Sequence, residues 1–247
     1  MNHDQASRLE QGFHFSVIIP VYNEEGLLET AVNDLIGRLN EIPLVHEVIL
    51  SENGSRDRTL EIANALARKH RNVRVLHTEE PNYGRALRRG IEAAVGALCI
   101  CDEIDICDVG FHRRAIEILS ADQADMVIGS KRHPDARDRR PFLRRFATRV
   151  INLMLRVLLG FRGTDTHGLK AFQRRALLPV VHQCVVEKDL FASELVIRAE
   201  RAGLRVVEVP LNVAEKRPPS INLLRRVPNV LRNLWRLFKV IRLGRPA

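Results

Sequence analysis

Four carboxylates follow an apolar run in the stretch "ALCICDEIDICD", residues 97–108. They are Asp102, Glu103, Asp105 and Asp108. Carboxylates this close repel one another unless a positive charge lies among them. Their oxygens are ligands that Mg²⁺ and Mn²⁺ prefer, and residues i and i+2 of an extended segment share one side. We therefore predict that Glu103 and Asp105 bind a divalent ion while Asp102 points elsewhere. The alternative is a solvated acidic turn, and Asp108 is expected to cap the helix that follows.

Two further motifs carry polar side chains after apolar runs. In "SENGSRDRT", residues 51–59, Glu52 precedes an Asn-Gly turn, where a carboxylate can accept hydrogen bonds from a nucleobase or a ribose. A plain strand-to-helix turn is the alternative. In "NYGRALRRG", residues 82–90, Arg85 lies in the first turn of a predicted helix. An arginine at that place can bind a pyrophosphate, although a solvated arginine would look the same in the sequence.

The elements that position these residues alternate along the first half of the chain. Short apolar runs rich in β-branched residues predict strands, and amphipathic patterns between them predict helices. The predicted strands are 15–22, 46–51, 73–78, 98–102 and 125–130. This rhythm is typical of the α/β class, with a mostly parallel sheet and helices on both faces. Ligands of such sheets bind beyond the carboxyl ends of the strands, where all of these motifs lie.

The second half of the chain is more basic and less regular. Residues 131–145 are basic and interrupted by proline, which predicts a mobile loop, and residues 146–161 predict an apolar helix. The stretch "GTDTHGLKAFQRRAL", residues 163–177, predicts a turn that enters a helix. Residues 191–211 predict a helix, a stop at Gly203 and a final strand.

The C-terminal segment predicts an amphipathic helix. Its apolar stripe consists of Val230, Leu231, Leu234, Leu237, Phe238 and Ile241, and its basic face of Arg232, Arg236 and Lys239. An apolar stripe with a basic flank and a tryptophan is typical of a helix that lies on an anionic membrane surface. Packing on the protein's own core is the alternative. We divide the chain into a tail (1–14), a main domain (15–213) and this basic segment (214–247).

Composition narrows the class of protein. The chain has 247 residues, 45% of them hydrophobic, a formal charge of +9 and a pI near 10.0. Such a charge favours an anionic partner, but only 5% of residues are aromatic, so no nucleic-acid partner is expected. The four cysteines have no zinc spacing and predict reduced core thiols in a cytosolic protein. We find no secretory signal and no apolar run of the ~20 residues that span a bilayer, so we expect a soluble or peripheral protein.

Six motifs taken together resemble a known family. They are "VIIPVYNEE", "SENGSRDRT", "NYGRALRRG", "EID", "GSKR" and "GLKAFQRRAL". Their order and spacing resemble those of the family 2 glycosyltransferases with the GT-A fold. The nearest branch resembles the dolichol-phosphate mannose synthases and polyprenyl-phosphate glycosyltransferases. The resemblance covers roughly residues 15–213.

The resemblance implies roles for individual residues. The donor nucleotide would lie along Pro20, Tyr22 and Glu24, with its base and ribose at Glu52 and Asn53 and its phosphates near Ser130, Lys131 and Arg132. The family's D-x-D motif, which holds the metal and the diphosphate, falls on Glu103-Ile104-Asp105, with Asp102 as the rival ligand. Lys170 matches a segment near the acceptor. Asn53 stands where the family usually has an acid, which leaves the choice between GDP and UDP open. Glu103 replaces the first aspartate of D-x-D, which leaves open how the ion is held.

The expected function follows from these roles. In an inverting transfer, an acceptor oxygen attacks the sugar opposite the departing nucleotide diphosphate, and Asp105 would hold the Mg²⁺ or Mn²⁺ that offsets the leaving charge. A hydroxyl acceptor needs a general base, for which Asp189 and Glu194 are the candidates. A lipid phosphate needs none, and the basic segment 131–145 favours it.

We therefore predict a metal-dependent enzyme that moves a sugar from a GDP- or UDP-sugar to a polyprenyl phosphate, as a peripheral protein at the cytoplasmic membrane face. Transfer to a hydroxyl of a glycan or glycolipid is one alternative. A non-catalytic module that binds membrane or nucleic acid through a degenerate acid site is the other.

Overall fold

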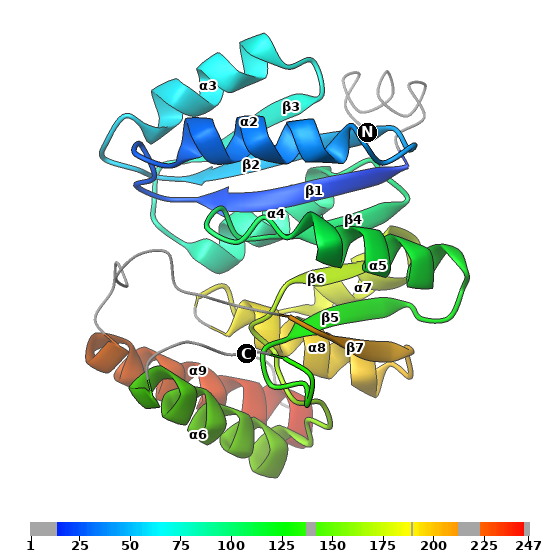
Figure 1. Ribbon diagram of the computed structural model, residues 1–247. Coiled ribbons are helices and arrows are strands. Elements are labelled where there is room, and N and C mark those ends of the chain that lie inside the picture. The colour runs from blue at the N-terminus through cyan, green and yellow to red at the C-terminus, as the bar shows by residue number, and fades with distance from the viewer. Residues whose placement is uncertain (1–13, 137–141, 189, 212–222, 245–247) are drawn as a thin grey trace.

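The fold is an alternation of strands and helices, seen here in a computed structural model that describes residues 14–136, 142–188, 190–211 and 223–244 (Figure 1). The first half contains β1 (Phe15–Val21), α2 (Leu28–Leu39), β2 (His46–Asn53), α3 (Thr59–Lys69), β3 (Val73–Thr78), α4 (Tyr83–Ala93), β4 (Leu98–Cys101), α5 (Val109–Ser120) and β5 (Met126–Ser130). All five strands predicted for this half are present. Asp108 caps α5 as expected, because its Oδ1 accepts a hydrogen bond from the Phe111 amide at 3.0 Å.

The second half departs from the predicted pattern at two places. It contains α6 (Phe142–Leu159), β6 (Lys170–Gln173), α7 (Arg174–Gln183), α8 (Phe191–Arg201), β7 (Val206–Pro210) and α9 (Leu223–Leu243). Residues 170–173 belong to the stretch predicted as a turn that enters a helix, but they form a strand because they are buried and pair with both β4 and β5. The predicted loop 131–145 ends earlier, since α6 begins at Phe142, and residues 137–141 lie outside the described residues. The predicted stop at Gly203 is confirmed by its left-handed φ of 77°.

One sheet of seven strands runs through the described molecule in the order β3-β2-β1-β4-β6-β5-β7. Neighbouring strands are parallel except at β6, which pairs antiparallel with β4 and with β5. The predicted α/β architecture with a mostly parallel sheet is therefore confirmed.

Buried side chains form one apolar cluster on each face of the sheet. The helices α2, α3 and α5 supply the cluster on one face. The other cluster receives residues from α4, α7 and α8, and also from α6 and α9. All four cysteines are free and buried, as predicted for core thiols. The parallel strands β1, β2 and β3 end at the left edge of Figure 1, so the polar motifs that follow them share that edge.

The C-terminal helix differs from the sequence prediction in the face that it exposes. Leu234 and Leu237 of the predicted membrane stripe are buried, and Val230, Phe238 and Ile241 pack partly against the same core cluster. Most of that stripe therefore faces the protein, because α9 packs beside α6. Among the described residues, no helix is long and apolar enough to cross a membrane.

Candidate functional site

The acidic segment after β4 forms a tight turn. The amides of Ile106 and Cys107 donate to the Glu103 carbonyl at 2.9 and 3.1 Å. The chain therefore turns here, whereas we predicted an extended segment. Ile104 is buried in the core beneath the turn, while the side chains of Glu103 and Asp105 on either side of it stay partly exposed. The turn, rather than a strand, therefore sets the positions of these two carboxylates.

Asp102 stabilises this turn through two contacts. Its Oδ1 accepts from the Glu103 amide at 2.7 Å, and its Oδ2 lies 2.5 Å from Nε2 of His112 on α5. Both side chains of this pair are fully enclosed. The geometry agrees with the expectation that Asp102 points away from an ion site, and it gives no support to Asp102 as the rival ligand. His112 was missed in the sequence, where only its place ten residues after Asp102 could have suggested the contact.

The carboxylates of Glu103 and Asp105 fit a divalent cation. Neither makes a hydrogen bond or an ion pair with any residue that the structure describes. Burial raises the pKa of Glu103, the charge of Lys131 opposes this shift, and the nearby Asp105 carboxylate adds to it. Two unpartnered oxygen ligands beside each other are the donor set that Mg²⁺ or Mn²⁺ takes from proteins. No set of three or more His, Cys, Asp or Glu residues with metal geometry occurs in the described ranges, so such an ion would take its other ligands from elsewhere.

Tyr83 adds an aromatic hydroxyl to the acidic turn. Its side chain is 42% exposed, but its hydroxyl is desolvated, which raises its pKa well above the ordinary value, and the charge of Glu103 acts in the same direction. Tyr83 is the first residue of α4, so it links the acidic turn to the motif that contains Arg85. Tyr83 was missed in the sequence, where this motif stood out for its arginines.

Two lysines, Lys131 and Lys170, lie near the carboxylate of Glu103. Lys131 donates to the His167 carbonyl at 3.0 Å, and its Nζ lies 3.7 Å from Oδ2 of the buried Asp165. Burial alone would raise the pKa of Asp165, but the charge of Lys131 and backbone hydrogen bonds outweigh it and lower that pKa. Asp165 was hidden in a segment that we predicted as a turn.

Lys170 is neither a surface lysine nor a side chain that reaches into solvent. It lies on the interior strand β6, is almost fully buried, and donates to the Gly168 carbonyl at 2.7 Å. Burial lowers its pKa to about 8, and the neighbouring Asp165 and Glu103 charges oppose that shift. An acceptor could therefore contact Lys170 only if this region opened, so the role implied by the resemblance has no support in the geometry.

Glu52 and Asn53 both engage the protein itself. Oε1 of Glu52 accepts from the Ser55 amide at 2.6 Å, and Oε2 lies 2.5 Å from Nδ1 of His77. Burial would raise the pKa of Glu52, but hydrogen bonds from Ser55 and His77 outweigh it and lower that pKa. Oδ1 of Asn53 accepts from the Asn82 amide at 2.5 Å. The side chain of Glu52 is fully enclosed, so it does not offer the open carboxylate that we expected for a nucleobase or ribose.

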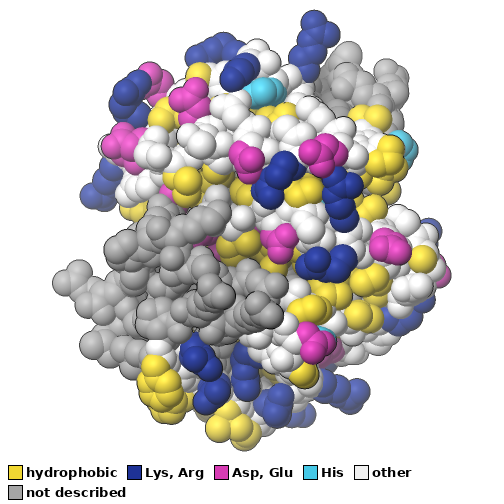
Figure 2. Space-filling view, in the orientation of Figure 1, with side chains coloured by type: hydrophobic (Ala, Val, Ile, Leu, Met, Phe, Trp, Pro, Cys, Tyr) yellow, Lys and Arg dark blue, Asp and Glu magenta, His cyan; other side chains and the backbone are white. Residues whose placement is uncertain are grey.

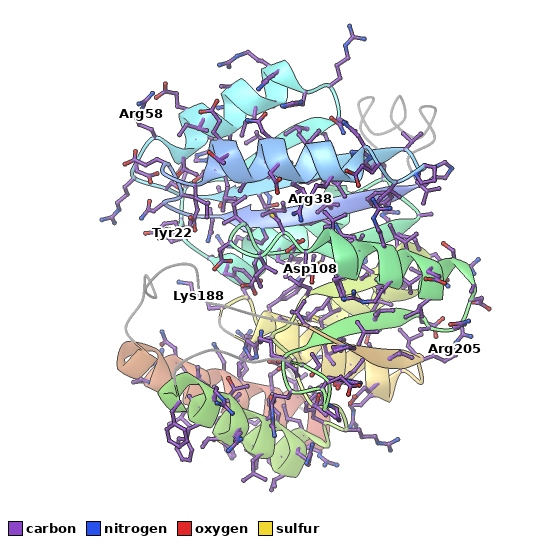
Figure 3. The ribbon with its side chains drawn as sticks, viewed as in Figure 1. Tyr22, Arg38, Arg58, Asp108, Lys188 and Arg205 are labelled. Atoms are coloured by element: carbon purple, nitrogen blue, oxygen red, sulfur yellow. The ribbon has the colours of Figure 1, made fainter. Side chains whose placement is uncertain are left out.

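The other residues that we expected to contact the donor nucleotide lie at the ends of β1 and β5. Pro20 and Tyr22 are partly exposed, and Figure 3 shows Tyr22 at the edge where β1 ends. Glu24 is buried at the turn that follows, and its amide donates to the Thr59 hydroxyl at 2.6 Å.

The end of β5 and the residues that follow it expose only one of the three predicted phosphate contacts. The Ser130 hydroxyl is buried against that of Thr164 at 2.6 Å, and Lys131 is engaged as described above. Arg132 is exposed, so it is the one of the three whose side chain is open to solvent. On α4, Arg85 pairs with Glu187 at 3.0 Å.

Of the two candidate general bases, Glu194 lies inside the protein. Its oxygens accept from the Val185 amide at 2.9 and 3.0 Å and from the Val186 amide at 2.8 Å, and Arg198 donates to it at 2.7 Å. The side chain is fully buried and its partners are structural, so the geometry gives no support to the expected role as a base. Asp189 lies outside the described residues.

Comparisons with known proteins agree with the predicted resemblance. The sequence profile described as glycosyl transferase family 2 matches residues 16–180. Glycosyltransferase AglD of Haloferax volcanii is 30% identical over 241 residues, which cover 94% of this chain. Undecaprenyl-phosphate mannosyltransferase of Micrococcus luteus is 29% identical over 212 residues, covering 81% of this chain. The chain spans 39% of the length of AglD and 83% of the mannosyltransferase.

Solved structures show the same fold. Glucosyl-3-phosphoglycerate synthase from Mycobacterium tuberculosis, in complex with Mn²⁺, UDP and phosphoglyceric acid, superposes with a TM-score of 0.67 at 23% identity. The match covers 97% of this chain and 82% of that chain. The predicted GT-A fold is therefore confirmed.

Proposed function

Because the chain belongs to glycosyl transferase family 2, we propose that it transfers a sugar from a nucleotide-diphosphate sugar to a polyprenyl phosphate, in a reaction that needs a divalent cation. We further propose that it works as a peripheral protein at the cytoplasmic face of a membrane. Its four free, buried cysteines suit a reducing compartment.

The observation that carries the donor part of this proposal is the pair of carboxylates on the turn after β4, Glu103 and Asp105, which have no partner among the described residues. These two residues would hold the cation, while Tyr22 and Arg132 lie at the same edge of the sheet for contacts to the nucleotide. Bound there, Mg²⁺ or Mn²⁺ would neutralise charge on the diphosphate as it leaves. The complex of glucosyl-3-phosphoglycerate synthase with Mn²⁺ and UDP supports a donor of this kind.

A phosphate acceptor is supported by the position of Glu194, the one candidate general base that the structure describes. Glu194 is enclosed and neutralised by Arg198, so it is not placed to take a proton from a hydroxyl. A phosphate acceptor is already anionic at neutral pH and needs no general base. The mannosyltransferase of M. luteus, whose name specifies undecaprenyl phosphate, agrees with an acceptor of this class.

The helices α6 and α9 support membrane attachment. Their outward side chains include Phe142, Phe146, Val150, Leu153 and Val157 of α6 and Leu231, Trp235 and Leu243 of α9, with exposures from 39 to 74%. Figure 2 shows hydrophobic side chains beside Lys and Arg side chains at the lower edge of the molecule, where Figure 1 places these two helices. We call this set the α6–α9 surface. Exposed apolar side chains with a basic rim suit an anionic membrane.

The donor site can be tested by thermal unfolding with GDP and with UDP, each with and without Mn²⁺. A nucleotide at ~100 times its dissociation constant should add about 2.7 kcal/mol to the free energy of unfolding. We expect this gain with one nucleotide only when Mn²⁺ is present, and we expect Glu103→Gln and Asp105→Asn to abolish it. Glu117→Gln, an exposed carboxylate of α5, serves as the control and should keep it. No gain with any combination would contradict the donor site.

The acceptor can be tested by sugar transfer to vesicles that contain a polyprenyl phosphate or a glycolipid with free hydroxyls. We expect transfer to the phosphate only, and activity that survives in Asp189→Asn. Transfer to the hydroxyl lipid, lost in Asp189→Asn, would support a hydroxyl acceptor instead.

Membrane attachment has a built-in reporter, because Trp235 is the single tryptophan of the chain. Its emission should shift to shorter wavelength with anionic vesicles, and Val157→Asp should weaken that binding. An unchanged spectrum would argue against the α6–α9 surface as a membrane contact.

A further inference from the structure

A polar cavity of about 510 Å³ lies between the start of α4, the segment 185–188 and α9. It is separate from the acidic turn, and none of its cationic residues on α9 or on the segment 185–188 has a role in the donor site. Its walls carry four cationic side chains, Arg85, Lys188, Arg232 and Arg236. Their positive charges need anionic partners.

Only one of these four cations has a carboxylate partner in the described part of the chain. Arg85 pairs with Glu187 at 3.0 Å and lies 3.7 Å from Glu80. These two carboxylates are the acidic residues of the cavity wall, and Arg85 engages both. Lys188, Arg232 and Arg236 make no ion pair with a described residue. Three cations that face one cavity, and that have no ion-pair partner in the described ranges, attract an anion from solution.

Close packing holds the walls of this cavity in place. A Cβ on Gly84 would lie 1.7 Å from the Glu187 carbonyl oxygen, so α4 and the segment 185–188 are in direct backbone contact. The amides of Val185 and Val186 are fixed by Glu194 on α8. On the opposite wall, the Asn233 side chain of α9 donates to the Lys188 carbonyl at 3.1 Å. The cations therefore project from three elements that are tied to one another.

The cavity lies between the acidic turn and the α6–α9 surface. Tyr83 follows the cavity residue Asn82 directly, and its hydroxyl lies in the field of Glu103. On the other side, Leu231 and Trp235 are exposed on the same helix that carries Arg232 and Arg236. Figure 3 shows Lys188 between α9 and the edge where β1 ends. A group bound here would be next to both the transfer site and the proposed membrane contact.

We propose that this cavity binds a phosphate monoester group, and that this group is the headgroup of the lipid acceptor. Three cations suit a phosphate monoester, which carries up to two charges and several acceptor oxygens, better than a diester with one charge. The assignment to the acceptor rests on the proposed function, whereas the anion site itself does not. We assign the donor diphosphate elsewhere, because its proposed cation ligands, Glu103 and Asp105, are not part of the cavity wall.

The test compares binding of the full chain to vesicles that contain phosphatidic acid, a monoester, or phosphatidylglycerol, a diester, at matched surface charge. Trp235 emission and co-sedimentation report binding. The wild type should prefer phosphatidic acid, and Lys188→Gln, Arg232→Gln and Arg236→Gln should each weaken that binding about tenfold or more, as expected for the loss of one charge-assisted hydrogen bond.

Lys239→Gln is the matched control, since Lys239 lies on α9 but not in the cavity wall. Lys188→Gln best distinguishes binding in the cavity from general attraction to the membrane, because Lys188 belongs to the cavity wall but not to α6 or α9. Equal losses in Lys239→Gln and Arg232→Gln, with no loss in Lys188→Gln, would show general attraction to the membrane and overturn the proposal. So would a wild type that does not distinguish the two lipids.

Two further measurements separate the remaining outcomes. Binding of soluble glycerol 3-phosphate with the same dependence on Lys188 would support the phosphate site but overturn its assignment to a lipid. The stabilisation by nucleotide and Mn²⁺ should be unchanged in all three cavity variants. This control shows that they fold, and it keeps a failure of the phosphate site distinct from a failure of the donor site.

Discussion

Replacement of Glu194 by alanine distinguishes a structural carboxylate from a catalytic base. The fully buried carboxylate accepts from the amides of Val185 and Val186 and from Arg198, with distances of 2.7 to 3.0 Å. Alanine would leave two amides, one of them buried, without an acceptor and Arg198, whose side chain is only 15% exposed, without its partner. The sequence spacing gave no sign of these contacts.

The expected loss is large for one side chain. Removing one partner of a buried ion pair costs about 3–5 kcal/mol, and hydrogen bonds to a charged group contribute roughly 1.5–3 kcal/mol each. Because these terms overlap, we expect a loss of about 3–5 kcal/mol in the free energy of unfolding. In a chain of this size the unfolding midpoint should fall by roughly 6–20 °C.

The assay is thermal and urea unfolding followed by circular dichroism, combined with transfer activity at a temperature where the variant is folded. Glu61→Ala is the control, because Glu61 pairs with Arg58 at 3.1 Å on the surface, and its loss should leave the unfolding midpoint nearly unchanged. We expect Glu194→Ala to be unstable but active. An unfolding midpoint within 2 °C of the wild type, together with a complete loss of activity, would refute our reasoning and restore Glu194 as the base.

Other predictions concern residues beneath and beside the acidic turn. Lys170 has a pKa near 8 in the folded protein and near 10.5 when unfolded, so the unfolded chain binds more protons between these pH values. The stability of the wild type relative to Lys170→Met should therefore rise by about 1–3 kcal/mol from pH 7.5 to pH 10, as measured by urea unfolding, and a flat difference would contradict the shift. Gly84→Ala should lower the unfolding midpoint measurably, because its Cβ would collide with the Glu187 carbonyl, whereas Gly26→Ala meets no atom within 4 Å and should not. His112→Phe should cost roughly 2–4 kcal/mol in urea unfolding, because it leaves the buried Asp102 carboxylate without its partner, and a neutral result would show that this contact carries no stability.

The positions of the strands and of the main motifs could be predicted from the sequence. β-branched apolar runs must be buried, and alternation with amphipathic helices leaves few arrangements other than a parallel sheet. In such a sheet the carboxyl ends of the strands share an edge, which places Tyr22, Glu52 and Glu103 near one another without any knowledge of the contacts. β6 escaped prediction because only four residues form it, and its pairing partners are distant in the chain.

The availability of each polar atom was decided by the tertiary structure alone. Glu52, Asp102 and Glu194 look like Glu103 in the sequence, but each is enclosed by a partner from another element, such as His77 or His112. The same holds for α9. Its sequence pattern predicts an apolar stripe, but it does not say whether the protein core or a membrane covers that stripe. The sequence thus determined the fold and the edge at which chemistry can occur, since burial follows local pattern. Which carboxylates remain free depended on contacts between distant segments, which local pattern does not specify.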